Sequence, residues 1–118
     1  EMLAPAPSDQ LLALGGWDGR QCFASVERYK PDLDLWEPWT AMRFRRTAFD
    51  AVVLQGRVYA LGGHDNGDYC SELERYDPEH NAWRRLAPMR TDRCHFAAAA
   101  LGGSLYVLGG QDNAARIL

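Results

Sequence analysis

The chain has 118 residues, of which 47% are hydrophobic and 25% charged, and this composition predicts a packed core rather than a disordered tail. Its net charge of −3, from 13 basic and 16 acidic residues, argues against a general nucleic-acid binder, which would carry a basic stripe. No apolar run approaches the roughly 20 residues that span a bilayer, and no signal-peptide pattern opens the chain, so a cytoplasmic location without membrane contact is expected.

The first predicted unit is incomplete. Residues 1–10 are expected to be an N-terminal remnant or linker, because Leu3-Ala4-Pro5 resembles the Leu86-Ala87-Pro88 that ends a later strand. Residues 11–42 follow as a partial unit, with strands expected near 11–16, 25–30 and 35–40. A strand before residue 11 is expected to be missing, since too few residues precede Gly15 to match the later spacing.

The second predicted unit, residues 43–89, is complete. Its strands are expected at residues 47–55, 58–61, 72–76 and 82–86. Gly56 marks a tight turn between the first two strands, as in a β-hairpin. A polar loop with Asn66-Gly67 turn chemistry separates the second strand from the third. Residues 90–118 are expected to hold the first two strands of a third unit, near 95–109.

An internal repeat relates these units. The glycine pairs Gly15-Gly16, Gly62-Gly63 and Gly109-Gly110 recur at a spacing of 47 residues. Aligning residues 11–71 with 58–118 gives 23 identities in 61 positions without a gap. The same offset relates Tyr29 to Tyr76, Tyr59 to Tyr106, Trp36 to Trp83, Met42 to Met89, Arg46 to Arg93 and Phe49 to Phe96. A repeat of this length with about four antiparallel strands is typical of one blade of a β-propeller.

The three cysteines, Cys22, Cys70 and Cys94, are predicted to be reduced thiols. No two of them lie two to four residues apart, so a zinc site is not expected. No cofactor and no metal are therefore predicted.

The repeat resembles the kelch motif. The best copy is residues 58–89, VYALGGHDNGDYCSELERYDPEHNAWRRLAPM, which is close to the kelch pattern along its whole length. The resemblance covers roughly residues 10–113 and implies an all-β fold of kelch-type propeller blades, each an antiparallel four-stranded sheet. The chain would supply about two to two and a half blades of an incomplete propeller, whose uncovered ends need missing blades or other copies of the chain.

The resemblance also implies structural roles for the repeated residues. Paired glycines would let neighbouring strands and blades approach closely, and large aromatic side chains would pack between blades. The anchors expected on this basis are Gly15, Gly16, Gly62, Gly63, Gly109, Gly110, Tyr29, Tyr76, Trp36 and Trp83.

Function is expected in the loops, because strands of a propeller blade form its core. In similar kelch propellers the loops between strands two and three share one face with the loops that join blades, and that face binds partner peptides. The partner-binding residues predicted there are Arg20, Arg45, Arg46, Arg93, Trp17, Phe23 and Tyr69. Arginine suits carboxylates and carbonyls of an acidic or extended peptide, and the aromatic residues suit binding hot spots.

Structural alternatives stay open for two groups of recurring loop residues. Arg46 and Arg93 recur at one repeat position, so they could instead bond backbone carbonyls between blades. Asp18, Asp65 and Asp112 also recur after the glycine pairs, and a turn-capping role is favoured over a metal role for them.

The overall prediction is a non-enzymatic module that binds a protein or peptide partner. Family resemblance extends this to substrate recognition for a cullin-type ubiquitin ligase, although no BTB region is present in these 118 residues. A self-associating repeat scaffold or an actin-binding kelch protein is the alternative. A propeller enzyme, an oxidase or a sugar isomerase, is disfavoured because the three histidines are poorly placed to converge.

Overall fold

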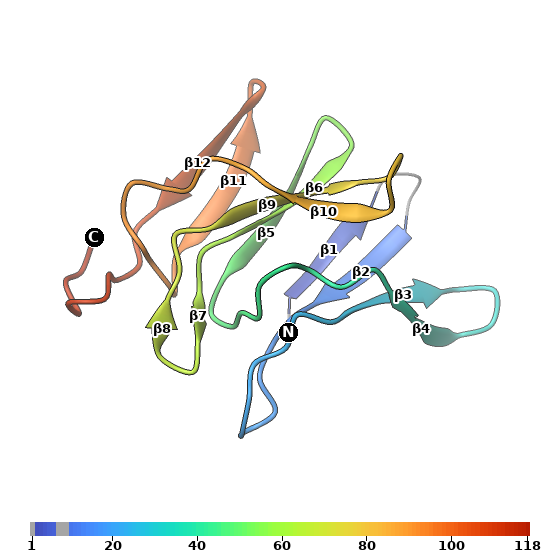
Figure 1. Cartoon of the computed structure of the whole chain (residues 1–118). Coiled ribbons are helices and arrows are strands. Elements are labelled where there is room, and N and C mark those ends of the chain that lie inside the picture. The colour runs from blue at the N-terminus through green and yellow to red at the C-terminus, as the bar shows by residue number, and fades with distance from the viewer. Residues whose placement is uncertain (1, 7–9) are drawn as a thin grey trace.

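The described residues form two four-stranded and two two-stranded antiparallel β-sheets, and three of these sheets are successive repeat units along the sequence (Figure 1). The computed structural model describes residues 2–6 and 10–118, and all regular elements in these ranges are strands. Blade 1 has the strand order β1-β2-β3-β4, made of Met2–Ala6, Gln10–Leu14, Val26–Lys30 and Leu35–Trp39. Within the described ranges no helix is long and apolar enough to cross a membrane.

Blade 2 repeats this architecture. Its strand order is β5-β6-β9-β10, made of Asp50–Leu54, Arg57–Leu61, Leu73–Asp77 and Ala82–Arg85. The chain segment that connects β6 to β9 forms a two-stranded hairpin, β7 (His64–Asp65) and β8 (Asp68–Tyr69). Asn66 and Gly67 at its tip both have positive φ, 50° and 94°, which is the geometry that Asn-Gly supplies in tight hairpin turns.

The third unit contains two strands, β11 (Ala97–Leu101) and β12 (Ser104–Leu108), paired antiparallel. Its alanine-rich β11 is a strand although alanine favours helix, because pairing with β12 outweighs local propensity. The fold is therefore all-β and built from antiparallel propeller blades, as the repeat predicted.

The expectation for the N-terminus was wrong. Met2–Ala6 is not a remnant or linker: it forms β1, which pairs antiparallel with β2 from Met2↔Leu14 to Ala6↔Gln10. Three residues separate β1 from β2, whereas two separate β5 from β6, so the ungapped 47-residue comparison does not extend into β1. Pro5 is tolerated because β1 lies at the edge of its sheet and has one strand neighbour there.

The first strands of the three units lie beside one another. In Figure 1, β5 lies between β1 and β11, and it contacts both. The buried apolar cluster sits where blade 1 meets blade 2 and comprises Leu12, Leu14, Val26, Met42, Phe49, Val58, Ala60, Tyr76 and Trp83. Among the described residues, β11 and β12 add no member to this cluster. The packing is thus strongest between the two complete blades.

The aromatic anchors of blade 2 pack against blade 1. Trp83 is 3% exposed, and its Nε1 donates a hydrogen bond of 2.9 Å to the carbonyl of Thr40. The Tyr76 ring lies 4.1 Å from that of Trp39 and 5.7 Å from that of Trp83, measured between centroids. The equivalent Trp36 of blade 1 is 40% exposed, although it lies 5.3 Å from Tyr29. Only the blade 2 anchors are covered by a neighbouring blade in the described structure.

Gly62 shows why this position takes glycine. Its φ of +62° belongs to the left-handed region, and a Cβ built there would lie 2.7 Å from the Arg93 carbonyl oxygen and 2.7 Å from the Phe96 ring. Gly15 repeats the arrangement, with the Arg46 carbonyl oxygen at 2.7 Å. The loop that joins two blades therefore lies directly on the end of the preceding second strand.

Candidate functional site

Two sets of loops are brought together at one end of the blades, which we call the loop face (residues 17–23, 43–49, 64–72, 90–96 and 111–118). The joining loop after blade 1 is hydrogen-bonded to the loop between β2 and β3 through Met42 N to Ala24 O (2.8 Å) and Arg46 N to Phe23 O (3.2 Å). Met89 N to Ser71 O (2.8 Å) repeats this contact one blade later. Side chains from different repeats therefore meet on a backbone framework that is fixed by the fold.

A first hollow of about 430 Å³ lies on the loop face between the joining loop after blade 1 and the segment of blade 2 that contains β7 and β8. Its lining residues combine cationic, acidic and aromatic side chains: Arg43, Phe44, Arg45, Asp65, Asp68, Tyr69, Cys70, Ser71 and Glu72. Arg45 is 60% exposed and pairs with Asp65 at 3.2 Å between Nε and Oδ2. Exposure of this kind makes the pair weak, so the Arg45 guanidinium remains available to an incoming carboxylate.

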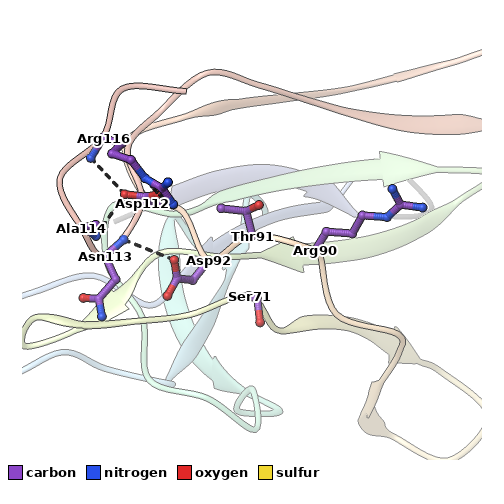
Figure 2. A pocket seen from close by; sticks show the side chains of 8 residues that line it. All are labelled: Ser71, Arg90, Thr91, Asp92, Asp112, Asn113, Ala114 and Arg116. Carbon is purple, nitrogen blue, oxygen red and sulfur yellow. Dashed lines mark hydrogen bonds and ion pairs between the residues drawn. The ribbon is translucent and has the colours of Figure 1, made fainter.

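A second hollow of about 550 Å³ occupies the equivalent place one repeat later (Figure 2). The 47-residue offset relates Arg43 to Arg90 and Asp65 to Asp112, but it replaces Arg45 by Asp92. Figure 2 shows Arg116 against Asp112 and the backbone N–H of Asn113 directed at Asp92, the latter at 3.2 Å. Hydrogen bonds from the Arg116 side chain and backbone lower the pKa of Asp112. The two hollows are thus lined by equivalent repeat positions, but the charged side chains at these positions differ.

A third hollow of about 350 Å³ is lined by Trp17, Thr47, Ala48, His64, Asn66 and His95. Trp17 is 61% exposed. The rings of His64 and His95 lie 6.3 Å apart, and His64 also stacks on Tyr69 at 5.8 Å, between centroids. His64 Nδ1 accepts a hydrogen bond of 3.0 Å from Gly67 N–H, which holds the ring in place. A large exposed aromatic residue beside two imidazoles is suited to packing against a peptide side chain.

Arg46 was wrongly predicted as a partner contact. Its side chain is 0% exposed and forms an ion pair of 2.7 Å with Glu74, which is also 0% exposed. Nη1 donates to the carbonyl oxygens of Gly62 (3.0 Å) and Glu72 (3.1 Å). Glu74 accepts further hydrogen bonds from the backbone N–H groups of Arg43 (2.7 Å) and Phe44 (3.3 Å). Arg46 therefore ties the joining loop to β6 and β9, which is the structural alternative named for it.

The other predicted residues divide by exposure. Trp17, Arg20 and Arg45 are exposed, whereas Phe23, Tyr69 and Arg93 are half-buried. Arg93 donates to the Gly109 carbonyl at 2.9 Å. Tyr69 accepts a hydrogen bond of 2.6 Å from Gln111, and its interaction with the Cys94 thiol raises the pKa of its hydroxyl. Trp17 lines the third hollow and Arg45 and Tyr69 line the first, while Arg20 and Phe23 line none of the three.

Two of the three recurring aspartates cap turns, as favoured from the sequence. Asp18 Oδ1 accepts hydrogen bonds from the backbone N–H groups of Arg20 (2.8 Å) and Gln21 (2.9 Å), and these bonds lower the pKa of Asp18. Asp112 does the same for Ala114 and Arg116. Asp65 differs, because it pairs with the Arg45 side chain.

One cluster of possible metal ligands occurs in the described part of the chain. Asp77, Glu79 and His80, in the turn between β9 and β10, bring ligand atoms within 4.8 Å of one another. His80 lies 2.7 Å from Asp77, and Arg84 donates to the same carboxylate at 3.2 Å. The His80 contact is the main reason that the pKa of Asp77 falls to about 2. These contacts already satisfy the carboxylate without an ion.

Sequence reasoning missed several residues that line the hollows, namely Arg43, Phe44, His64, Asn66, Arg90, His95 and Arg116. One signal could have indicated His64: the position directly after each glycine pair changes from Trp17 to His64 to Gln111, although its flanks are repeated. A variable position between repeated residues indicates where the copies of the repeat differ in surface chemistry.

Comparison with known proteins identifies the repeat. A family model described as the Kelch motif matches residues 4–43, 45–90 and 92–118. A Kelch repeat and BTB domain-containing protein of Caenorhabditis elegans is 43% identical over 51 residues, which is 42% of this chain and 9% of that protein. Influenza virus NS1A-binding protein of Homo sapiens is 38% identical over 50 residues, again 42% of this chain and 8% of that protein. The matched segments span less than a tenth of these relatives.

Proposed function

Because the chain belongs to the kelch-repeat family, we propose that this protein-interaction module binds an extended peptide or loop of a partner protein across its loop face. The observation that carries the proposal is the set of three hollows on the loop face, of which the second is lined by residues of two successive units and the third by residues of all three. Successive hollows suit an extended chain, since a strand advances by about 3.3 Å per residue and presents side chains alternately.

The chemistry of the hollows supports a partner with both an apolar and an acidic side chain. Trp17 would supply the aromatic contact in the third hollow, where 61% of its surface is exposed. Arg45 and Arg43, both exposed at the first hollow, would bind a carboxylate in a charge-assisted hydrogen bond. Arg20, also exposed, would add charge at the tip of the loop between β2 and β3.

A random peptide library tests this proposal, because it selects ligands directly on the loop face. Peptides enriched on the wild-type chain would be measured by fluorescence anisotropy against Trp17→Ala and against the double variant Arg20→Ala/Arg45→Ala. We expect each variant to weaken binding by about tenfold or more, as for residues that cost at least ~1.4 kcal/mol when truncated. The chain offers a matched control in Trp36→Ala, which removes an exposed tryptophan from β4, outside the loop face.

The control distinguishes the loss of a binding contact from a loss of stability. Trp36→Ala should leave the affinity within about twofold of wild type, which is ~0.4 kcal/mol. Circular dichroism should show all variants folded. Equal affinity of wild type, Trp17→Ala and the Arg20→Ala/Arg45→Ala variant for every enriched peptide would contradict the assignment of the loop face.

We further propose that the partner is a substrate recruited to a cullin-type ubiquitin ligase. This finer role is supported by the BTB-kelch composition named for one relative. Co-precipitation of a cullin with the protein that contains this chain is the expected result, together with lower ubiquitination of the bound partner in the Trp17→Ala variant. A protein that binds its partner but no cullin would remove the ligase role and leave the binding role intact.

A further inference from the structure

His64 lines the third hollow with a ring whose neutral form is selected by its surroundings. Its Nδ1 accepts a hydrogen bond of 3.0 Å from the backbone N–H of Gly67. A ring nitrogen that accepts a hydrogen bond carries no proton, so the neutral imidazole holds its hydrogen on Nε2. Protonation of the ring would direct a second N–H group at the Gly67 N–H and break this bond.

The backbone around His64 is held by bonds that do not depend on the ring. His64 N–H donates to the carbonyl of Thr47 at 3.0 Å, and its own carbonyl accepts from Thr47 N–H at 2.9 Å. The hairpin of β7 and β8 adds the pairing of His64 with Tyr69. A protonated imidazole would therefore leave Gly67 by rotation of its side chain, which removes one wall of the hollow and the stack on the Tyr69 ring.

His95 brings a second imidazole to the same hollow. Its ring centroid lies 6.3 Å from that of His64, and its backbone N–H donates to the carbonyl of Ala48 at 2.9 Å. The Tyr69 phenol that stacks on His64 stays uncharged, because its interaction with the Cys94 thiol raises its pKa. Two imidazolium rings at this distance would repel each other.

The carboxylates that are nearest to His64 along the chain line a different hollow. Successive residues of a strand point to opposite faces, so Asp65 lines the first hollow whereas His64 lines the third. Asp68 also lines the first hollow, and Asp65 is paired with Arg45 at 3.2 Å. The other residues that line the third hollow are uncharged. Its lining therefore offers no counter-ion to a protonated His64 or His95.

We propose that the third hollow binds an uncharged apolar side chain of the partner while His64 and His95 are neutral, and releases it when they are protonated. This pH dependence rests on the proposed peptide binding by the loop face. An apolar side chain packed on Trp17 and two neutral rings desolvates no charge, whereas the same side chain beside imidazolium does. Histidine changes its charge between about pH 5 and 8, so the partner is held at pH 7.5 and released at pH 5.5.

The carboxylate contact proposed for the first hollow does not respond to the same change in pH. The Arg45 guanidinium stays charged throughout, and a partner carboxylate with an ordinary pKa of about 4 is still ionised at pH 5.5. A loss of affinity between these two pH values therefore reports on the third hollow.

The test uses peptides enriched on the wild-type chain at pH 7.5, labelled with tetramethylrhodamine and titrated at pH 7.5 and 5.5 by fluorescence anisotropy. The double variant His64→Asn/His95→Asn removes both imidazoles, and asparagine keeps a side-chain acceptor for the Gly67 N–H. The matched control is His80→Asn, which removes the third histidine of the chain, 61% exposed in the turn between β9 and β10. Circular dichroism establishes that each protein is folded at both pH values.

We expect the wild type and His80→Asn to bind about tenfold more weakly at pH 5.5, as when the binding-competent form falls to about a tenth. The affinity of the double variant should change by less than about twofold. The NMR signal of the Gly67 amide gives a readout without peptide. It should shift together with the His64 ring signals of the wild type as pH falls, and stay in place in the double variant.

Three results would overturn the pH dependence and leave peptide binding intact. The first is an equal affinity of the wild type at both pH values, or a loss at pH 5.5 that persists in the double variant. The second is tighter binding at pH 5.5, because a carboxylate would then occupy the hollow. The third is a Gly67 amide signal that does not follow the protonation of His64. Failure to enrich any peptide on the folded chain would instead contradict binding by the loop face itself, and the pH dependence with it.

Discussion

The junction between blades 1 and 2 and the third unit are built from the same repeat, yet their surroundings differ. At the first junction Arg46 is 0% exposed and paired with Glu74, whereas Arg93 in the third unit is half-buried and bonds one carbonyl. Leu61 of β6 is 2% exposed, and the equivalent Leu108 of β12 is 60% exposed. Within these 118 residues, the same residue types are thus covered where a third strand follows and uncovered where none is described.

This difference shows that the burial of a residue in a repeat protein depends on the neighbouring segment that covers it, and not on its own repeat alone. Each unit contributes one half of an interface, and stability comes from the completed interfaces. Substitutions at equivalent repeat positions should therefore lower the free energy of unfolding by very different amounts, depending on whether the described chain contains the strand or blade that covers the residue.

The largest contrast is expected between Arg46→Met and Arg93→Met. Arg46→Met leaves the fully buried Glu74 carboxylate without its cation and should lower the free energy of unfolding by about 3–5 kcal/mol. Arg93→Met removes one hydrogen bond to a backbone carbonyl and should cost about 1 kcal/mol. Urea denaturation followed by tryptophan fluorescence measures both. Similar losses for the two variants would contradict the role of the completed interface.

A second contrast compares the two tryptophans of the fourth strands. Trp83→Ala removes a side chain that is 3% exposed and bonded to the Thr40 carbonyl, and should cost about 3–4 kcal/mol. Trp36→Ala removes a side chain that is 40% exposed and should cost about 1 kcal/mol, since less of its area is transferred back to water. Thermal unfolding by circular dichroism gives the comparison, and equal shifts in Tm would count against it.

The smallest contrast concerns Gly62 and Gly109. Gly62→Ala places a Cβ 2.7 Å from the Arg93 carbonyl oxygen and should cost about 1–3 kcal/mol beyond the backbone strain of its positive φ. Gly109→Ala carries the same strain, because its φ is +72°, but its nearest neighbour is 3.9 Å away. The difference in urea midpoint between the two variants therefore measures the steric cost of the close contact between Gly62 and the joining loop. A Gly109→Ala variant that loses as much stability as Gly62→Ala would show that strain alone explains both costs.

Much of the fold could be predicted from the sequence, and the exceptions have physical causes. Strands β2 to β6 and β9 to β12 were expected near their observed places because hydrophobic periodicity and turn residues are local signals. β1 was missed because its connection to β2 is one residue longer than the connection of β5 to β6, which moves Met2–Ala6 out of the repeat frame. Pairing with β2 then decided its conformation.

The candidate site was predicted less completely. Trp17, Arg45 and Tyr69 lie in hollows of the loop face, but Arg46 is buried and Arg20 lines no hollow. Sequence cannot distinguish Arg45 from Arg46 by residue type, because both are arginines in one polar loop. The distinction depends on where Glu74 lies, and Glu74 is brought beside the loop by a strand that is 28 residues away along the chain.

The sequence by itself determined the repeat, its 47-residue period, the all-β blades and membership in a family of interaction modules, because each of these is encoded in local patterns that recur. Within these 118 residues, only the tertiary structure showed which copy of a repeated residue is covered by a neighbouring strand. This coverage depends on contacts between segments distant in the chain, such as Arg46 with Glu74 and Trp83 with Thr40, and these contacts exist where a neighbouring strand completes them.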